Sequence, residues 1–189
     1  MNLTNLFVEL IITGFHTSLW IGFIVITFIN YDTIDISNLF NMNKAVPLVA
    51  LAYIIGTVVD RITDIIFMPK DHKIRNKYLT EELPSYITMR FFILHKSKDI
   101  YYQLEYTRSR LRIVRSAVLN FALTTVTLIP FEWFQLFKND SIQFKIFIFA
   151  LTFTLGSFLS YICYVSWSSL TKSYVCSVIA AFKMLSEEK

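Results

Sequence analysis

Four long apolar stretches, separated once by a basic hydrophilic segment, constrain this chain of 189 residues more than any other feature. A helix needs about 20 apolar residues to cross the hydrocarbon core of a bilayer, because all of its backbone hydrogen bonds must be made within the segment. Four stretches are long enough, and they run from about residue 6 to 29, 45 to 68, 116 to 137 and 146 to 170. The sequence therefore predicts an all-α protein with four transmembrane helices in a single membrane domain.

The composition is that of a membrane protein, since 54% of the residues are hydrophobic and 18 are phenylalanine. An ordinary soluble domain is less apolar than this. The first five residues carry no charged side chain, whereas a secretory signal peptide has a basic start and a short apolar core. We therefore expect the first span to remain in the mature protein.

The basic segment over residues 69–115 sets the predicted orientation. It contains eleven of the eighteen lysines and arginines, and positively charged loops are retained in the cytoplasm. The link over residues 30–43 carries Asp32 and Asp35 but no lysine or arginine, which suits the outer side. We therefore predict a multi-pass protein whose amino and carboxyl termini both lie in the cytoplasm.

Helix signals within the basic segment predict a cytoplasmic helical extension between the second and third spans. Pro69 and the polar run after it are typical of a loop, and Pro84 with Ser85 is typical of a helix start. Ser97 or Asp99 can cap the next helix. No proline or glycine follows until Pro130, so the third span should project into the cytoplasm as a stalk.

The fourth span is also expected to continue beyond the membrane. Apolar residues from Val175 to Leu185 recur at helical spacing, which predicts a cytoplasmic carboxyl-terminal helix over residues 171–189.

Acidic and basic side chains gather at the inner ends of the second and third spans. Asp60 and Asp64 are four residues apart, which places them on one helical face, and Arg61 can reach Asp64. A basic stripe enters the third span at i, i+4 and i+7, and its members are Arg108, Arg112 and Arg115. Two interpretations remain open: ion pairs that lock the two helices together, or a vestibule or anion-binding stripe with the aspartates as counter-charges and latch.

Polar residues also line one face of the first span, where Glu9, Thr13, His16 and Trp20 share a helical stripe. Ionisable side chains at this depth face protein or water rather than lipid. Asn120 is the corresponding polar residue of the third span. The pattern fits either interhelical hydrogen bonds or a water-lined face.

The fourth span has a face of small residues at i, i+4 and i+7, formed by Gly156, Ser160 and Cys163. Such a face permits close approach of a second helix, within one protomer or between protomers.

No motif for a nucleophile, a metal site or a phosphate-binding loop is recognisable, so the sequence predicts no enzymatic activity and no cofactor. Asp60 and Asp64 beside an arginine leave a lipid-phosphate enzyme holding Mg²⁺ as the lesser alternative. No internal repeat is present, which disfavours a transporter. Because four helices enclose little volume, a conducting pathway would form between copies, and a pore predicts a homo-oligomer.

The VDR-x-x-D end of the second predicted span and the Y-x-R-S-R-x-R run into the third resemble small bacterial four-span membrane proteins of anti-phage systems. Membrane accessory proteins of RNA-targeting CRISPR systems are among these. The resemblance implies a bacterial inner-membrane homo-oligomer, a pore or ion channel, that permeabilises or depolarises the membrane in antiviral defence.

The basic inner face and the absence of a recognisable sensor domain in this sequence predict the partners. Besides membrane lipids, we expect a cytoplasmic protein, a nucleotide or a nucleic acid to act on the basic inner face as the trigger. The alternative function is a non-conducting membrane anchor that recruits such a partner.

Overall fold

The computed structural model describes residues 3–29, 42–79 and 83–187 of the chain. The predicted outer link, with Asp32 and Asp35, and the last two residues of the predicted carboxyl-terminal helix lie outside the described residues. Within the described ranges the elements are α1 (Leu3–Phe28), α2 (Met42–Tyr78), α3 (Tyr86–Lys96), α4 (Lys98–Phe131), the π-helical turn η3 (Glu132–Leu136) and α5 (Ile142–Glu187). These ranges contain no strand, so the all-α prediction is confirmed.

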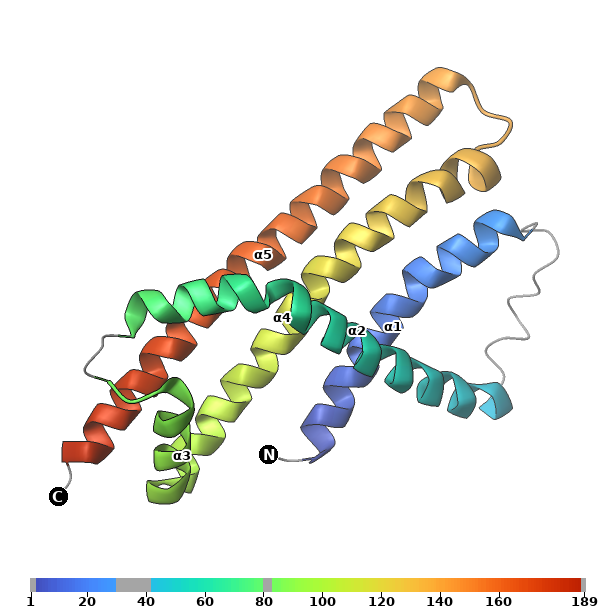
Figure 1. Ribbon diagram of the computed structural model, residues 1–189. Helices are drawn as coiled ribbons and strands as arrows, with labels where there is room; N and C mark the ends of the chain where they lie inside the picture. Colours follow the sequence, from blue (N-terminus) through green and yellow to red (C-terminus); the bar gives the residue numbers. More distant parts are fainter. Residues whose placement is uncertain (1–2, 30–41, 80–82, 188–189) are drawn as a thin grey trace.

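α1, α4 and α5 form the main body of the molecule (Figure 1). α1 lies beside α4, and α5 returns antiparallel to α4. Among the described residues, three helical segments are long and apolar enough to cross a membrane, namely Phe7–Phe28, Lys98–Leu136 and Ile142–Glu187. They correspond to the first, third and fourth predicted spans.

α2 is arranged differently, because it crosses the other three helices obliquely (Figure 1). Side chains in its middle, such as Ala52, Thr63 and Phe67, are buried against the bundle. Apolar side chains on its other face, such as Leu51 and Ile65, are exposed. α2 is not among the three segments that qualify as spans, and a fourth span stays a prediction.

The predicted loop after Pro69 is wrong, because α2 continues through this residue to Tyr78. A proline inside a helix removes one backbone hydrogen bond and usually kinks or ends the helix. Here Phe67 before it and Ile74 after it both pack against the same hydrophobic core. Arg75 also pairs with Asp71 one turn earlier. Tertiary packing on both sides of the proline therefore holds the helix together.

Serine caps fix the starts of the next two helices. Ser85 Oγ accepts a hydrogen bond from the Thr88 amide at 3.2 Å, so the predicted start of α3 is confirmed. Of the two candidate caps for α4, Ser97 fills the position, accepting from the Ile100 amide at 3.5 Å. These caps satisfy amide groups that a helix start leaves without partners.

The hydrophobic core lies at one end of the molecule, where α2, α3, α4 and α5 meet. We call this the polar end, because it also contains the charged halves of these helices. The core cluster consists of Phe67, Met89, Ile93, Leu104, Leu111, Trp167, Tyr174, Val178, Ala181 and Leu185. The opposite half of α5 exposes large apolar side chains such as Phe147 and Phe158. α5 has 46 residues, a length of about 69 Å that exceeds the roughly 30 Å hydrocarbon core of a bilayer.

Candidate functional site

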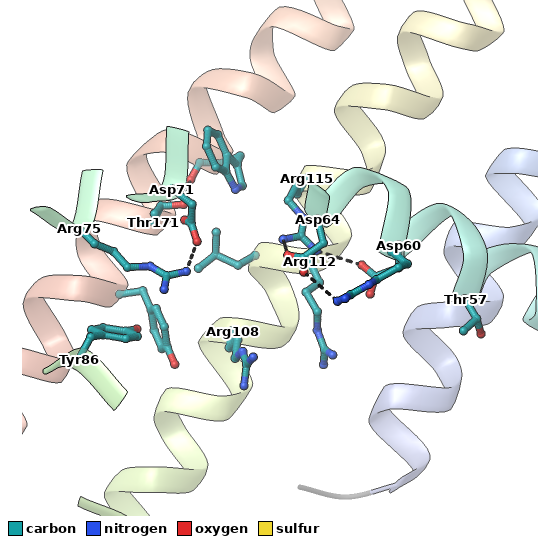
Figure 2. A pocket seen from close by; sticks show the side chains of 14 residues that line it. Thr57, Asp60, Asp64, Asp71, Arg75, Tyr86, Arg108, Arg112, Arg115 and Thr171 are labelled. Atoms are coloured by element: carbon teal, nitrogen blue, oxygen red, sulfur yellow. Dashed lines mark hydrogen bonds and ion pairs between the residues drawn. The ribbon is translucent and has the colours of Figure 1, made fainter. Parts of the chain in front are cut away.

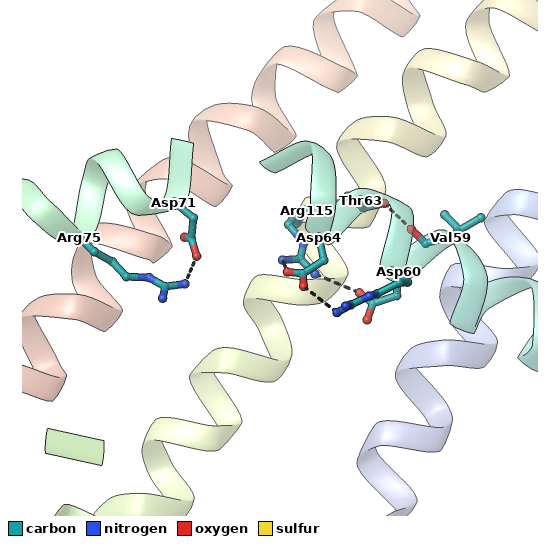
Figure 3. Close-up of polar contacts among 8 residues, drawn as sticks. Val59, Asp60, Thr63, Asp64, Asp71, Arg75 and Arg115 are labelled. Carbon is teal, nitrogen blue, oxygen red and sulfur yellow. Dashed lines mark hydrogen bonds and ion pairs between the residues drawn. The ribbon is translucent and has the colours of Figure 1, made fainter. Parts of the chain in front are cut away.

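Arg115 of α4 binds two carboxylates of α2 where these helices cross (Figure 3). Its Nη1 lies 2.5 Å from Asp64 Oδ1, and its Nη2 lies 3.3 Å from Asp60 Oδ1. Only 11% of the Arg115 side chain is exposed. The structure thus brings one arginine of the basic stripe together with both predicted counter-charges.

Arg61 occupies a weaker position in the same cluster. Its Nη1 lies 3.6 Å from Asp64 Oδ2, and 75% of its side chain is exposed. Arg115 lies closer to the same carboxylate, so the negative charge of Asp64 is shared and neutralises Arg61 only in part.

Arg112, the next member of the basic stripe, forms its ion pair with α1 instead of α2. Its Nη2 lies 3.1 Å from Glu9 Oε2. Glu9 is buried, and its second carboxylate oxygen has no hydrogen-bond partner among the described residues. Neighbouring turns of α4 are therefore tied by ion pairs to two different helices, α1 through Arg112 and α2 through Arg115.

Asn120 is the centre of a buried polar contact between α1 and α4. Its Oδ1 lies 3.1 Å from Thr17 Oγ1 and accepts a hydrogen bond from Trp20 Nε1 at 3.2 Å. Its Nδ2 donates to the carbonyl oxygen of Thr13 at 3.4 Å. The polar face of α1 thus packs against α4.

His16 belongs to the same face of α1 but makes an aromatic contact instead. Its ring lies edge-on against Phe121 of α4, with 4.8 Å between the ring centroids. Glu9, Thr13, His16 and Asn120 therefore all lie against protein. This placement favours interhelical bonding over a water-lined face within one protomer.

Arg108, the third member of the basic stripe, lies nearer the polar end. Its Nη1 is 3.6 Å from Glu105 Oε1, a buried carboxylate that Arg90 of α3 already holds at shorter range. The Arg108 side chain is 46% exposed. Sequence reasoning missed the Arg90–Glu105 pair, although the two residues flank a single helix-to-helix turn.

A charged cavity of about 450 Å³ lies between α2 and the polar end of α4 and α5 (Figure 2). Figure 2 shows that the three arginines of the basic stripe line one wall and that Asp60 and Asp64 face them from α2. The full lining is Thr57, Asp60, Arg61, Asp64, Asp71, Arg75, Tyr86, Arg108, Leu111, Arg112, Arg115, Trp167, Thr171 and Tyr174. Every residue of the two predicted charge groups therefore reaches this cavity.

Two glycines, Gly14 and Gly56, let the backbones of α1 and α2 approach closely, and sequence reasoning missed this contact. A Cβ added to Gly14 would lie 1.7 Å from the Ala52 carbonyl oxygen, and one added to Gly56 would lie 1.9 Å from the Leu10 carbonyl oxygen. The chain has only four glycines, so their positions within apolar helices were the available signal. The residues on either side of this contact include Glu9 and Asp60, so it positions both carboxylates.

The small-residue face of α5 packs against α4. A Cβ on Gly156 would meet the Thr125 hydroxyl at 1.8 Å, and Ser160 Oγ donates to the Val118 carbonyl oxygen at 3.1 Å. Cys163 is a partly buried free cysteine. The close approach at Gly156 and Ser160 is thus made within one protomer.

No group of three or more His, Cys, Asp or Glu side chains in the described part of the chain is arranged to hold a metal ion. No protein-family model, curated protein or solved structure matches the chain. The function must therefore be argued from the geometry of the charged cavity and from the three long apolar helices.

Proposed function

We propose that the chain is a homo-oligomeric membrane protein that forms a pore or perturbs the bilayer, and that it is gated at its basic face. In this proposal the polar end is cytoplasmic and the membrane is the bacterial inner membrane. The resemblance of the VDR-x-x-D and Y-x-R-S-R-x-R segments to small anti-phage membrane proteins supports a role in defence.

One observation carries the proposal: consecutive arginines of α4 hold α1 and α2 by separate ion pairs beside a cavity. Arg112 pairs with Glu9 and Arg115 pairs with Asp60 and Asp64. We call these two groups of pairs the latch. Because each pair joins a long helix to α4, exchanging a partner in the latch would let these helices move relative to one another.

The pathway in this proposal lies between protomers. The polar side chains of α1 are engaged in the contact with α4, as Asn120 and Thr13 show. The outer face of α5 offers large apolar side chains over its whole membrane-length half. The engaged polar face of α1 favours a pathway between copies over one through a single protomer, and the apolar face of α5 suits contact with lipid or with a neighbouring copy.

Dye release from vesicles tests the proposal. We expect Arg115→Gln to change the release of a trapped fluorophore from liposomes severalfold, since it removes the nearest cation from Asp60 and Asp64 and leaves Asp64 with the exposed Arg61. The paired exchange Arg115→Asp with Asp64→Arg should bring release back towards wild type. Arg110→Gln is the matched control, because Arg110 is exposed on the same helix and does not line the cavity. A monomeric chain with no release in any variant would contradict the proposal.

A second candidate, the non-conducting anchor, has its own supporting observation. Four large side chains of α3 and α4 are each more than half exposed, and we refer to them together as the patch: Ile87, Phe91, Tyr102 and Tyr106. Tyr102 and Tyr106 precede Ser116, where the apolar stretch of α4 begins, by 14 and 10 residues. At about 1.5 Å per residue the patch lies roughly 15 to 20 Å below that point, beyond the reach of the lipid tails.

The anchor predicts that a protein partner covers this patch. Phe91→Ser with Tyr106→Ser should then abolish co-purification of that partner while leaving dye release unchanged. Retention of the partner by this double variant would contradict the anchor function.

A further inference from the structure

We propose that the charged cavity binds a small phosphate monoester, of about the size of a mononucleotide, with its phosphate group held by Arg108 and Tyr174. This inference rests on the proposed function, because it names the ligand whose binding would rearrange the latch. Three properties of the cavity lead to it: its size, its incompletely neutralised arginines and a buried hydroxyl group.

The size and mixed lining of the cavity fit a small organic ligand. Its volume of about 450 Å³ falls within the range of about 300 to 1,000 Å³ that is usual for ligand pockets. Leu111 and Trp167 give it an apolar wall, while most of the remaining lining is charged or hydroxylated. Such a division suits a ligand that has an organic part and an anionic group.

Two arginines of the lining share a carboxylate that another arginine holds more closely. Arg61 is 3.6 Å from Asp64, which lies nearer to Arg115. Arg108 is likewise 3.6 Å from Glu105, which Arg90 binds. A guanidinium presents several N–H donors in a plane and matches phosphate oxygens in a bidentate manner. Arg61 and Arg108 thus retain binding capacity for an anion, and Arg108 is the one that lies on the side of Asp60 and Asp64 facing Tyr86 (Figure 2).

Tyr174 supplies a hydrogen-bond donor that the protein itself does not use. Tyr174 is 6% exposed and lines the cavity, and its hydroxyl has no hydrogen-bond partner among the described residues. A buried hydroxyl without a partner is unfavourable, because its hydration is lost without replacement. A phosphate oxygen accepting from this hydroxyl would remove that penalty.

Tyr86 lies next to Tyr174 and adds a second hydroxyl to the cavity wall. The two rings meet edge-on with 6.4 Å between their centroids, and the Arg75 guanidinium lies 5.0 Å from the Tyr86 ring centroid. Burial raises the pKa of Tyr86, so its phenol stays protonated and able to donate at physiological pH. Figure 2 shows Tyr86 and Arg75 at one end of the cavity, Asp60 at the other end and Arg108 between them.

A phosphate monoester has two natural sources at this position. A soluble nucleotide would enter from the aqueous side of the polar end. A lipid with a phosphate monoester headgroup would enter from the bilayer, because the cavity lies close to Ser116, where the apolar stretch of α4 begins. The chemistry recognised by Arg108 and Tyr174 is the same in both cases.

Binding to the full-length chain in nanodiscs distinguishes these sources. One arm titrates AMP and inorganic phosphate into protein in phosphatidylcholine nanodiscs by calorimetry. The other arm measures retention of phosphatidic acid against phosphatidylcholine by native mass spectrometry. The variants are Arg108→Gln and Tyr174→Phe, and Arg110→Gln is the control of equal charge.

We expect Arg108→Gln to weaken binding about tenfold and Tyr174→Phe to weaken it severalfold. Arg110→Gln should stay within about twofold of wild type, because a single exposed charge contributes little. Tyr174→Phe should leave the unfolding temperature of the ligand-free protein unchanged or raise it, since it removes an unpaired buried hydroxyl. This combination separates a ligand-binding hydroxyl from one that supports the fold.

Binding in the AMP arm supports a soluble ligand, and selective retention of phosphatidic acid alone supports a lipid headgroup. The proposal is overturned if neither arm detects binding, or if Arg110→Gln weakens it as much as Arg108→Gln. Dye release reports separately on the proposed function. Cavity-dependent binding without any effect on release would contradict gating and leave the ligand site standing.

Discussion

Glu9 of α1 lies 3.1 Å from Arg112 of α4, and this ion pair joins two helices that are each long and apolar enough to cross a membrane. The Glu9 side chain is buried, so the arginine is its main compensation for lost hydration. The Glu9–Arg112 pair is therefore the part of the latch whose removal should lower the stability of the protein most directly.

Arg112→Ala should destabilise the protein strongly, because it leaves the buried Glu9 carboxylate without a cation. Removing one partner of a buried pair costs about 3 to 5 kcal/mol, and the partial exposure of Arg112 places the expected loss near the lower figure. The measurement is the midpoint of denaturation in detergent. Glu9→Gln combined with Arg112→Gln should recover most of the loss, and Arg110→Ala should have little effect. Equal midpoints for Arg112→Ala and Arg110→Ala would show that the pair is not formed.

Alanine at Gly14 or Gly56 should separate α1 from α2. The added methyl group would overlap the backbone of the opposite helix, and overpacking of this kind costs about 1 to 3 kcal/mol. Gly22→Ala is the matched control, because nothing lies within 4 Å of a Cβ there. Since alanine is a better helix former than glycine, Gly22→Ala should be neutral or stabilising by up to about 1 kcal/mol. Stability measured by thermal unfolding should therefore move in opposite directions at Gly56 and Gly22.

Asn120→Leu should weaken the contact between α1 and α4. It removes the acceptor for Trp20 Nε1 and the donor to the Thr13 carbonyl oxygen. Interhelical hydrogen bonds within membranes contribute about 0.6 to 2 kcal/mol, so the loss should be of that order. Trp20 fluorescence should shift as its indole loses the bond. Thr154→Val is the control, because the exposed Thr154 bonds only to the carbonyl oxygen of its own helix.

Cysteine labelling tests the proposed orientation, in which the polar end is cytoplasmic. Cys176 is exposed near the end of α5, and Cys163 is partly buried in its apolar part. We expect a membrane-impermeant maleimide to label Cys176 in inverted vesicles but not in intact cells. The Cys176→Ser variant should show no labelling in either preparation. Labelling of Cys176 in intact cells would place the polar end outside.

The long helices were predictable because their signal is local. About 20 consecutive apolar residues leave few alternatives to a helix, and α1, α4 and α5 each contain such a run. The continuation of α4 and α5 beyond the apolar stretches was predictable as well, because it depends on helical periodicity and on the absence of proline and glycine. Ser85 likewise marked the start of α3 through its capping chemistry.

The path of α2 was not predictable, because it depends on contacts between distant parts of the chain. Pro69 indicated a loop, yet Phe67 and Ile74 pack into a core that α3, α4 and α5 complete. The oblique crossing depends on Gly14 meeting the backbone of Ala52 and Gly56 meeting that of Leu10, a relation between distant residues that no local pattern contains.

The candidate site was predictable in its charges but not in its pairing. The spacing of Asp60 and Asp64 indicated one acidic face, and the basic stripe indicated a complementary one. Which arginine meets which carboxylate depends on the angle between the helices. The sequence also contained no sign that Tyr174 would be buried with an unused hydroxyl, since that property arises only when α3 closes over α5.

The length of α5 has a mechanical consequence. A single uninterrupted rod connects the cavity wall at Tyr174 to the far tip of the molecule, with no hinge between them. The part of α5 between Tyr174 and the far tip at Ile142 is about 48 Å long, so a pivot of roughly 5° at the cavity wall moves that tip by about 4 Å. A small rotation of α5 caused by changed side-chain contacts at the cavity would therefore produce a larger displacement of its opposite end.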